Sequence, residues 1–383
     1  MKTDRYANPL STSNPDAVMA YQTGADHILA ATYGAVWSMA KAVTWDPDFA
    51  LGHVGHARAL MYSGDMPGAK AAIDRAVALA ERGGLDDREL SHIALFAALL
   101  SGQAAQARRM GDAHVRDWPL DALVAQLNCQ VFGLIGFSGC AGREDAMLAH
   151  TTALSPHYGE DWWFLSVHAQ SLCETGAPEA ALEMMERALT LHDGNANAAH
   201  FKAHALYETG RGTEGRMYLD EWMAGYDARG LLHGHLSWHR ALWALEDGDM
   251  TAFWTLYDAG IGPGTGPGSS LPLNVLTDAA ALLWRAELAG HDIPAARWRA
   301  VSQYAAERFP NPGQSFADMH AALAHAMAGD GAALAQLAEA KAGFAADLVR
   351  PVSVAWQATA RGQWAEALSG LGPGGGDRAR VGG

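Results

Sequence analysis

Residues 176–189 read Gly176-Ala-Pro-Glu-Ala-Ala-Leu-Glu-Met-Met-Glu-Arg-Ala-Leu189 and combine a turn with a helix-like run. After the glycine, small and aliphatic residues recur at spacings of three and four, which places them on one face of an α-helix. The run from Ala69 to Val77 repeats this pattern after Gly64. A single helix of this kind cannot bury its own apolar face, so the pattern predicts helices that stack against their neighbours.

Equivalent glycines recur along the chain, each between two helix-like patterns. The clearest are Gly64, Gly102, Gly176, Gly210, Gly248, Gly329 and Gly362, with weaker members at Gly24, Gly139 and Gly290. Asp46-Pro47 and Ser155-Pro156 mark the ends of two units, because proline stops a helix. A period near 34 residues with a glycine turn is typical of tetratricopeptide repeats. The sequence therefore predicts an all-α fold of tetratricopeptide-like helix-turn-helix repeats in a right-handed superhelical array.

Three parts of the chain differ in composition. We expect residues 1–15 to form an N-terminal arm and residues 16–369 a single helical-repeat domain. A stretch rich in glycine and proline, residues 260–272, predicts a long loop inserted between units. Such a loop could be a lid, or an insertion that the array merely tolerates. The glycine-rich tail, residues 370–383, is expected to be disordered.

Composition narrows the class of protein. The chain has 77 Ala but only 15 Val and 6 Ile, a bias toward helix formers. Its formal net charge of −15 argues against nucleic acid or an anionic membrane as a partner. Three cysteines, an odd and sparse set, indicate a reducing compartment. With no secretory signal and no uninterrupted apolar span, the sequence predicts a cytoplasmic protein.

The 17 histidines are the least usual feature of the composition. Eight of them fall in the expected first helix of a repeat, which in tetratricopeptide arrays lines the inner surface: His56, His92, His168, His200, His204, His235, His239 and His320. Two pairs, His200 with His204 and His235 with His239, are spaced i,i+4 and so share a helix face. This spacing can hold a divalent metal between two imidazoles.

The chemistry of these pairs stays open at the level of sequence. Neither pair carries the glutamate of an H-E-x-x-H metalloprotease, so any carboxylate must come from elsewhere: Asp278, Asp318 or Glu287. Histidines can also bind a ligand as neutral hydrogen-bonding groups without any ion. Trp238, beside His239, is the best candidate for a groove wall, whereas most other tryptophans are expected to pack between helices.

Several segments resemble the tetratricopeptide repeat protein 38 family and its bacterial members. These are Asp161-Trp-Trp-Phe-Leu-Ser-Val-His168, Ala199-His-Phe-Lys-Ala-His204, His235-Leu-Ser-Trp-His239, Asp278-Ala-Ala-Ala-Leu-Leu-Trp-Arg285 and Asp318-Met-His320. The resemblance spans roughly residues 15–345. It implies a compact helical-repeat fold and candidate ligand-binding positions that include His168, Asp278, Arg285 and His320. Phe201 and Lys202 replace small residues of the family pattern, and Lys202 would favour an anionic ligand if it pointed inward.

Three hypotheses follow from these patterns. The first is a binding protein whose groove takes a small molecule or a peptide segment through the histidines and tryptophan. The alternative is an enzyme, a hydrolase or lyase, with His200, His204, His235 and His239 as metal ligands or as acid and base. In that case Asp278 and His320 would complete the site, and the 260–272 loop would close over it. The third hypothesis is that the histidines only hydrogen-bond between helices.

Overall fold

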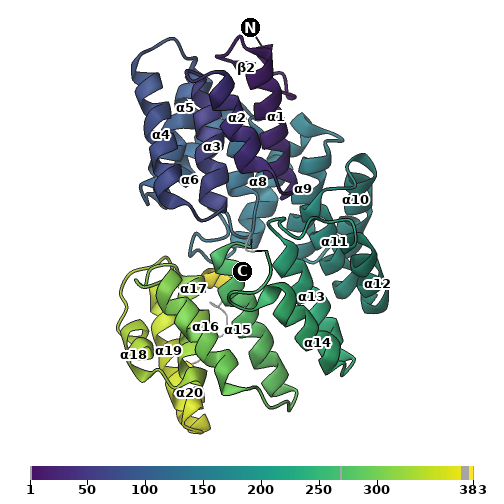
Figure 1. The fold of residues 1–383 in the computed structure, drawn as a ribbon, viewed down its shortest axis with the longest axis vertical. Coiled ribbons are helices and arrows are strands. Elements are labelled where there is room, and N and C mark those ends of the chain that lie inside the picture. Colours follow the sequence, from purple (N-terminus) through teal and green to yellow (C-terminus); the bar gives the residue numbers. More distant parts are fainter. Residues whose placement is uncertain (1, 268–269, 372–378, 383) are drawn as a thin grey trace. The chain divides into compact units, whose positions relative to one another are not determined.

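The computed structural model describes residues 2–267, 270–371 and 379–382. Over these residues it contains twenty α-helices, one π-helical turn and a pair of two-residue strands (Figure 1). The prediction of an all-α fold built from tetratricopeptide-like helix pairs is confirmed. The chain divides into two compact units, where the sequence predicts one domain over residues 16–369. Unit 1 comprises residues 1–136 and 144–232, and unit 2 comprises residues 137–143 and 233–383.

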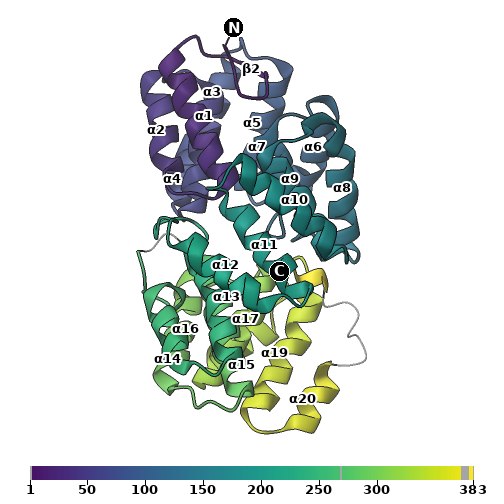
Figure 2. The ribbon, with the colours of Figure 1, turned by 90° about the vertical axis from the view of Figure 1, so that its right-hand side faces the viewer.

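Unit 1 is a series of helix pairs in which the two helices of each pair pack against one another (Figure 2). The pairs are α1 with α2, α3 with α4, α5 with α6, α9 with α10 and α11 with α12. The elements are β1 (Lys2–Thr3), β2 (Pro9–Leu10), α1 (Pro15–Ala30), α2 (Ala35–Trp45), α3 (Ala50–Tyr62), α4 (Met66–Glu81), α5 (Asp87–Leu100), α6 (Ala104–Asp117), α7 (Ala122–Asn128), α8 (Arg143–Tyr158), α9 (Trp162–Glu174), α10 (Pro178–Leu191), α11 (Ala196–Glu208) and α12 (Gly212–Met223).

The repeat pattern sets these boundaries through its turns. Gly176 and Gly210 both adopt positive φ, 89° and 73°, between the two helices of a pair. A side chain at such a position is strained, so glycine is the residue that lets the chain reverse there. The second helix then begins at a capping residue: Asp65 accepts a hydrogen bond from the backbone of Gly68 at the start of α4.

Two of the expected unit boundaries are wrong. Gly24 is not a turn; it lies inside α1, where a Cβ would come within 2.8 Å of Met39 Cγ, so the missing side chain permits close packing with α2. Pro156 does not follow a helix but lies within the last turn of α8. The first pair instead turns between Ala31, in the left-handed region with φ 55°, and Gly34.

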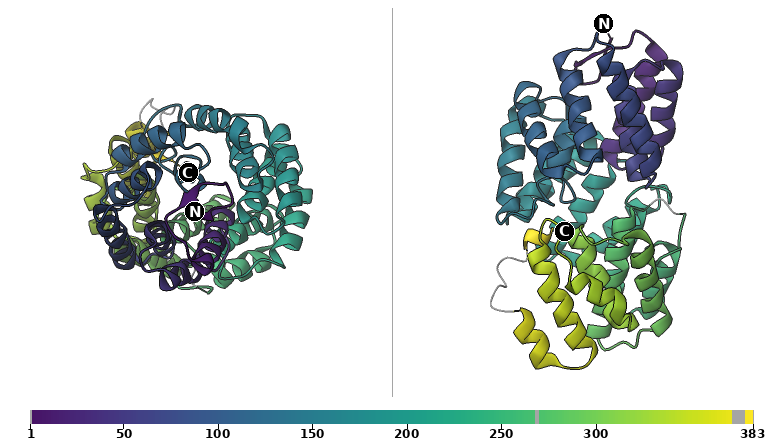
Figure 3. Two further views of the ribbon diagram at one scale, coloured as in Figure 1. Left: turned by 90° about the horizontal axis from the view of Figure 1, so that it is seen from above. Right: turned by 90° about the vertical axis from the view of Figure 1, so that its left-hand side faces the viewer.

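The N-terminal arm is ordered by hydrogen bonds to several helices of unit 1. Its two strands pair antiparallel, with Lys2 opposite Leu10. Arg88 of α5 donates to the Pro9 carbonyl, and Asn8 donates to the carbonyl of Leu120. Arg5 donates to Asp161, the N-cap residue of α9. The arm therefore lies on the inner side of the unit 1 helices, as the left panel of Figure 3 shows.

Unit 2 continues the helix pairs around a core of alanine, leucine and aromatic residues. Its elements are α13 (His233–Glu246), α14 (Met250–Leu256), the π-helical turn η1 (Tyr257–Ile261), α15 (Pro272–Leu288), α16 (Ala295–Arg308), α17 (Ser315–Ala328), α18 (Gly331–Ala338), α19 (Ala346–Ala360) and α20 (Trp364–Leu371). Helices α13, α15 and α17 are the first helices of successive pairs, and α15 packs on both of the others.

The loop between η1 and α15 is shorter than the stretch 260–272 that the sequence predicts. Gly260 and Ile261 belong to η1, and Pro272 begins α15, so only residues 262–271 connect the two. Residues 268–269 of the loop and 372–378 of the tail lie outside the described residues. Residues 379–382 depart from the expected disorder, because Arg380 donates to the Gly139 carbonyl and pairs with Asp347, and Val381 is buried.

None of the helices in the described part of the chain combines the length and the hydrophobicity that a membrane span requires.

Candidate functional site

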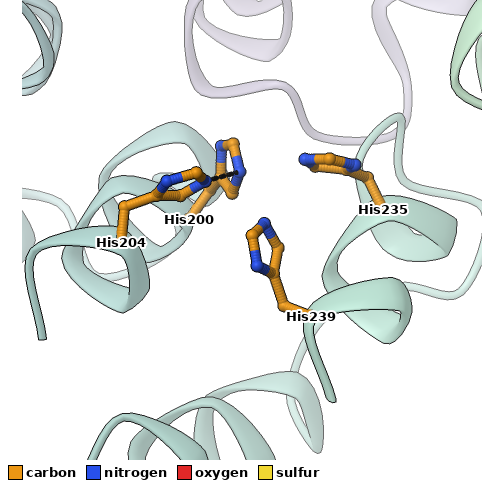
Figure 4. A group of neighbouring side chains, drawn as sticks. All are labelled: His200, His204, His235 and His239. Carbon is orange, nitrogen blue, oxygen red and sulfur yellow. Dashed lines mark hydrogen bonds between the residues drawn. The ribbon is translucent and has the colours of Figure 1, made fainter. Parts of the chain in front are cut away.

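Helix α13 carries His235, Trp238 and His239 on one side. Its buried residues include Leu236, Ala241 and Trp243, and Ala241 and Ala244 belong to the core of unit 2. Positions 235, 238 and 239 recur at spacings of three and four, so they gather on a different, half-buried face. The His235 ring stacks on Trp238 at 5.5 Å between centroids. It lies edge-on to the His239 ring at 4.9 Å (Figure 4).

Asp278 of α15 fixes the orientation of His235. Its carboxylate Oδ2 lies 2.9 Å from His235 Nδ1, and Asp278 is only 6% exposed. Because a carboxylate accepts, Nδ1 of His235 carries the proton and donates it. The lone pair of His235 therefore resides on Nε2. This arrangement of carboxylate and imidazole is the one that orients metal-ligating histidines in proteins.

Trp238 and Arg285 form a second part of the site. The Trp238 indole Nε1 is buried and has no hydrogen-bond partner among the residues that the structure describes. The Arg285 guanidinium of α15 lies over the Trp238 ring, 5.6 Å from its centroid, and its side chain is exposed. An indole N–H and a guanidinium close together can both donate to one anionic group.

His320 of α17 borders the same region of unit 2. Its Nδ1 donates to the carbonyl of Phe316 one turn earlier, at 2.8 Å, which leaves Nε2 as an acceptor. Burial lowers the pKa of His320; among the charged groups, Asp278 raises it and Arg285 lowers it. His320 is therefore neutral at physiological pH and lies within electrostatic range of both charged residues of the site.

In unit 1, His200 and His204 form the other i,i+4 pair, on α11. Their Nε2 atoms are 2.9 Å apart and share one hydrogen bond, so one ring donates and the other accepts (Figure 4). The opposite side of α11 is anchored by buried Ala199, Ala203 and Leu206. Two zinc-bound nitrogens at about 2.1 Å from the ion would be roughly 3.4 Å apart, so small ring rotations would let this pair hold one ion.

Lys202 and His168, which were also expected to bind a ligand, contact neighbouring helices instead. Lys202 pairs with Glu186 of α10 at 3.3 Å and lies over the Tyr218 ring of α12 at 4.4 Å. Its charge is therefore compensated among second helices of unit 1. His168 hydrogen-bonds to Thr151 of α8 at 2.9 Å and stacks on Phe164. These contacts are those of side chains that pack between helices.

The eight histidines do not all line one groove. His92 is only 1% exposed and bonds to Asp121 inside unit 1. A pattern that sequence spacing did not reveal joins hydroxyl groups to histidines of neighbouring helices: Thr151 with His168, Ser302 with His325 and Ser91 with His114. Each hydroxyl residue precedes its histidine by 17 or 23 positions, and no local sequence signal marks such a pair. For these histidines, hydrogen bonding between helices is the role that the geometry supports.

The other two carboxylates proposed from the sequence, Glu287 and Asp318, have hydrogen-bond partners other than the paired histidines. Glu287 accepts a hydrogen bond from the Trp298 indole of α16. Asp318 is 1% exposed and accepts from the Gly313 backbone, while burial raises its pKa to about 6. Asp278 is thus the candidate carboxylate whose hydrogen bond goes to a histidine of the pairs.

Asp318 gives unit 2 a specific pH dependence. Its folded-state pKa of about 6 lies above the usual 3.8, so unit 2 loses stability as pH rises between these two values. Asp318→Asn keeps an acceptor for the Gly313 amide without the charge. We expect it to raise the free energy of unfolding by about 1–3 kcal/mol at pH 8 and to change it little near pH 4. Urea unfolding at the two pH values measures this difference, with exposed Asp292→Asn as the control. Equal effects at both pH values would contradict it.

Comparison with known proteins gives similarity of backbone only. No family model matches the chain. A human IFIT1 dimer with m7Gppp-AAAA is 13% identical and covers 94% of this chain and 81% of its own, with a TM-score of 0.46. Yeast Tom70 is 11% identical, with 93% and 90% covered and a TM-score of 0.43. The P58(IPK) TPR domain is 14% identical, with 93% and 98% covered and a TM-score of 0.24.

The prediction that nucleic acid is not a partner is contradicted. The net charge of −15 led to the exclusion of nucleic acid as a partner, yet the IFIT1 chain similar to this one was solved with a capped oligonucleotide. The exclusion is therefore wrong as drawn. Charge summed over a whole chain does not describe the local surface that meets a ligand, and only that local surface decides binding.

Proposed function

We propose that this chain is a tetratricopeptide-like binding protein that takes a small anionic ligand at the α13/α15/α17 site of unit 2. The observation that carries the proposal is the buried Trp238 N–H, which has no acceptor among the described residues and lies next to the exposed Arg285 guanidinium. A buried donor without a partner is costly, and a carboxylate that accepts from both groups would remove that cost. The neighbouring imidazoles of His235, His239 and His320 supply further polar contacts.

We further propose that His235 and His239 of unit 2 hold a divalent transition-metal ion, and that His200 and His204 of unit 1 are a second candidate pair of ligands. Each pair has both rings on one helix face, on α13 and on α11 respectively. Asp278 holds His235 with Nε2 as the ligand atom. A set made only of imidazoles suits zinc, copper, nickel or cobalt rather than calcium or magnesium, which prefer oxygen. The ion would add positive charge beside Arg285 and so strengthen binding of an anion.

A metal-dependent hydrolase or lyase is the second candidate. The hydrogen bond between Asp278 and His235 favours it, because the same contact that orients a metal ligand also orients a general base. In that case His235 or His239 would take a proton from the substrate, and the segment 262–271 between η1 and α15 would cover the site. Turnover of a bound ligand would separate this function from binding alone.

Family and compartment are also proposals. The His-bearing segments around residues 168, 200–204 and 235–239 support membership of the tetratricopeptide repeat protein 38 family, on the side of its bacterial members. The cysteines Cys129, Cys140 and Cys173 are all free thiols, which supports a cytoplasmic location.

Trp238→Phe and Arg285→Gln test the anion site. With the metal-loaded protein and a panel of small carboxylates and phosphates in isothermal titration calorimetry, we expect each substitution to weaken binding of the best anion about tenfold or more, because each removes one donor to a charged group. Exposed Arg299→Gln on α16 serves as the matched control and should bind like the wild type. Equal affinity of all four proteins, or binding by none, would contradict the proposal.

A further inference from the structure

Unit 1 contains a small cavity that the proposed function does not use. The arm residues Asp4, Arg5 and Tyr6 form one wall, Tyr21 and Asp26 of α1 form another, and Asp121 closes it before α7. Its volume is about 20 Å³, enough for one group of the size of a water molecule. Asp26, with 43% of its side chain exposed, lies at the edge toward solvent.

The cavity has an excess of negative charge. Four carboxylates lie in or beside it, those of Asp4, Asp26, Asp121 and Asp161, against the guanidinium groups of Arg5 and Arg88. Arg88 is bound by Asp121, and Arg5 is shared between Asp26 and Asp161. Asp4 is held by the amides of Tyr6 and Asn8. Burial raises the pKa of Asp4 and of Asp26, as it does where no cation fully compensates a carboxylate.

Two polar atoms at the cavity lack hydrogen-bond partners among the described residues. Tyr21 is 4% exposed, its ring packs edge-on to Phe49, and the residue lines the cavity; its hydroxyl makes no hydrogen bond within the described part of the chain. The Asp26 Oδ1 atom is buried and accepts no hydrogen bond, although the Arg5 guanidinium is 3.3 Å away. A buried hydroxyl and carboxylate oxygen with free lone pairs are acceptors for a ligand that brings N–H donors.

We propose that this cavity binds the ammonium group of a primary amine. The three N–H donors of such a group match the Tyr21 hydroxyl and the carboxylates of Asp4 and Asp26, and its size matches the cavity. The rest of the ligand would extend past Asp26 toward solvent. Tyr21 lines the same space, and aromatic rings attract ammonium groups.

A metal ion fits this cavity less well than an ammonium group. Within the described residues, the only set of three or more histidine, cysteine or carboxylate side chains close enough for one ion consists of imidazoles. The carboxylates of the cavity are therefore too far apart to surround a divalent cation. An ammonium group needs no such shell, because it forms separate hydrogen bonds in different directions.

The test is calorimetric titration of the full chain, in the presence of EDTA, with methylammonium and butylammonium. Tetramethylammonium, which has the charge but no N–H donor and is too large, is the ligand control. We expect both primary amines to bind and tetramethylammonium not to bind. Tyr21→Phe, which keeps the ring and its packing, should weaken binding about tenfold, and so should Asp26→Asn. Asp16→Asn, an exposed carboxylate on the same helix, should bind like the wild type.

Two further titrations distinguish the possible sources of the amine. Nα-acetyl-lysine amide and a lysine-containing tripeptide distinguish a protein side chain from a free small amine; tighter binding of either group supports the cavity as an ammonium site. No binding of any primary amine, or binding that Tyr21→Phe and Asp26→Asn leave unchanged, would overturn it and leave the cavity as a water site only. EDTA keeps the histidines free of metal during this titration, whereas the anion site is tested with the metal-loaded protein. A negative result for the cavity therefore does not count against the proposed anion site of unit 2.

Discussion

Replacement of both His235 and His239 by alanine is expected to abolish divalent metal binding. The wild-type chain should carry about one ion after incubation with zinc and gel filtration, and the double variant less than about a tenth of that. The reason is that these two imidazoles are the proposed ligands of the ion in unit 2, and their loss removes the site. His200→Ala with His204→Ala tests the pair of unit 1 separately, by the same measurement. Elemental analysis by mass spectrometry on untagged protein measures it.

The control for this prediction is His157→Ala, which removes an exposed histidine of α8. This variant should keep the full metal content. Circular dichroism should show the same helicity in all the variants, since the substituted imidazoles are half-buried rather than part of the core. Full metal content in either double variant would mean that its pair is not a ligand of the ion.

Asp121→Asn is expected to lower the free energy of unfolding by about 3–5 kcal/mol. Asp121 Oδ2 accepts hydrogen bonds from Arg88, His92 and His114, at 2.7, 3.0 and 3.3 Å, and all four side chains are at most 5% exposed. Replacement by a neutral amide leaves the buried Arg88 cation without its counter-ion, and that unpaired charge is the main cost. Chemical denaturation followed by circular dichroism measures the loss.

The effect of Asp121→Asn on the free energy of unfolding should also depend on pH. Burial raises the pKa of Asp121, but His92, His114 and Arg88 outweigh it and hold that pKa well below the usual 3.8. The stabilisation is therefore present above about pH 4 and is lost as the pH falls through the folded-state pKa. The difference between wild type and variant should shrink in acid. Asp117→Asn, at the exposed end of α6, should change stability by less than about 0.5 kcal/mol. A similar small effect of Asp121→Asn would contradict the account of this cluster.

The helix pairs could be predicted from sequence because their signals are local. A glycine with positive φ and a run of alanines at spacings of three and four both act within about ten residues, as at Gly176 and Gly210. The prediction of a turn at Gly24 is wrong because glycine also occurs inside helices where two helices approach closely. Only the position of Met39 in the structure distinguishes close packing from a turn. The hairpin of the arm could not be predicted, since its order comes from Asp161 and Arg88, far away in the sequence.

Part of the candidate site could likewise be predicted from the sequence, and part of it could not. The i,i+4 pairs could be read from spacing, because a helix fixes which residues share a face. The bond from His235 to Asp278 joins residues 43 positions apart and needed the packing of α13 on α15. Asp121 was missed altogether: it precedes the short helix α7 and belongs to no repeat pattern. The role of Lys202 could not be settled from sequence, because its direction depends on Glu186 and Tyr218.

The most direct test of the account is X-ray absorption spectroscopy at the metal edge, on untagged full-length protein whose metal content is measured in parallel. The account predicts about one transition-metal ion per chain, with a coordination shell of imidazole nitrogens that is lost in the His235→Ala, His239→Ala variant. A protein that takes up no ion when zinc, copper, nickel and cobalt are each supplied, or an ion bound by sulfur or oxygen alone, would contradict it.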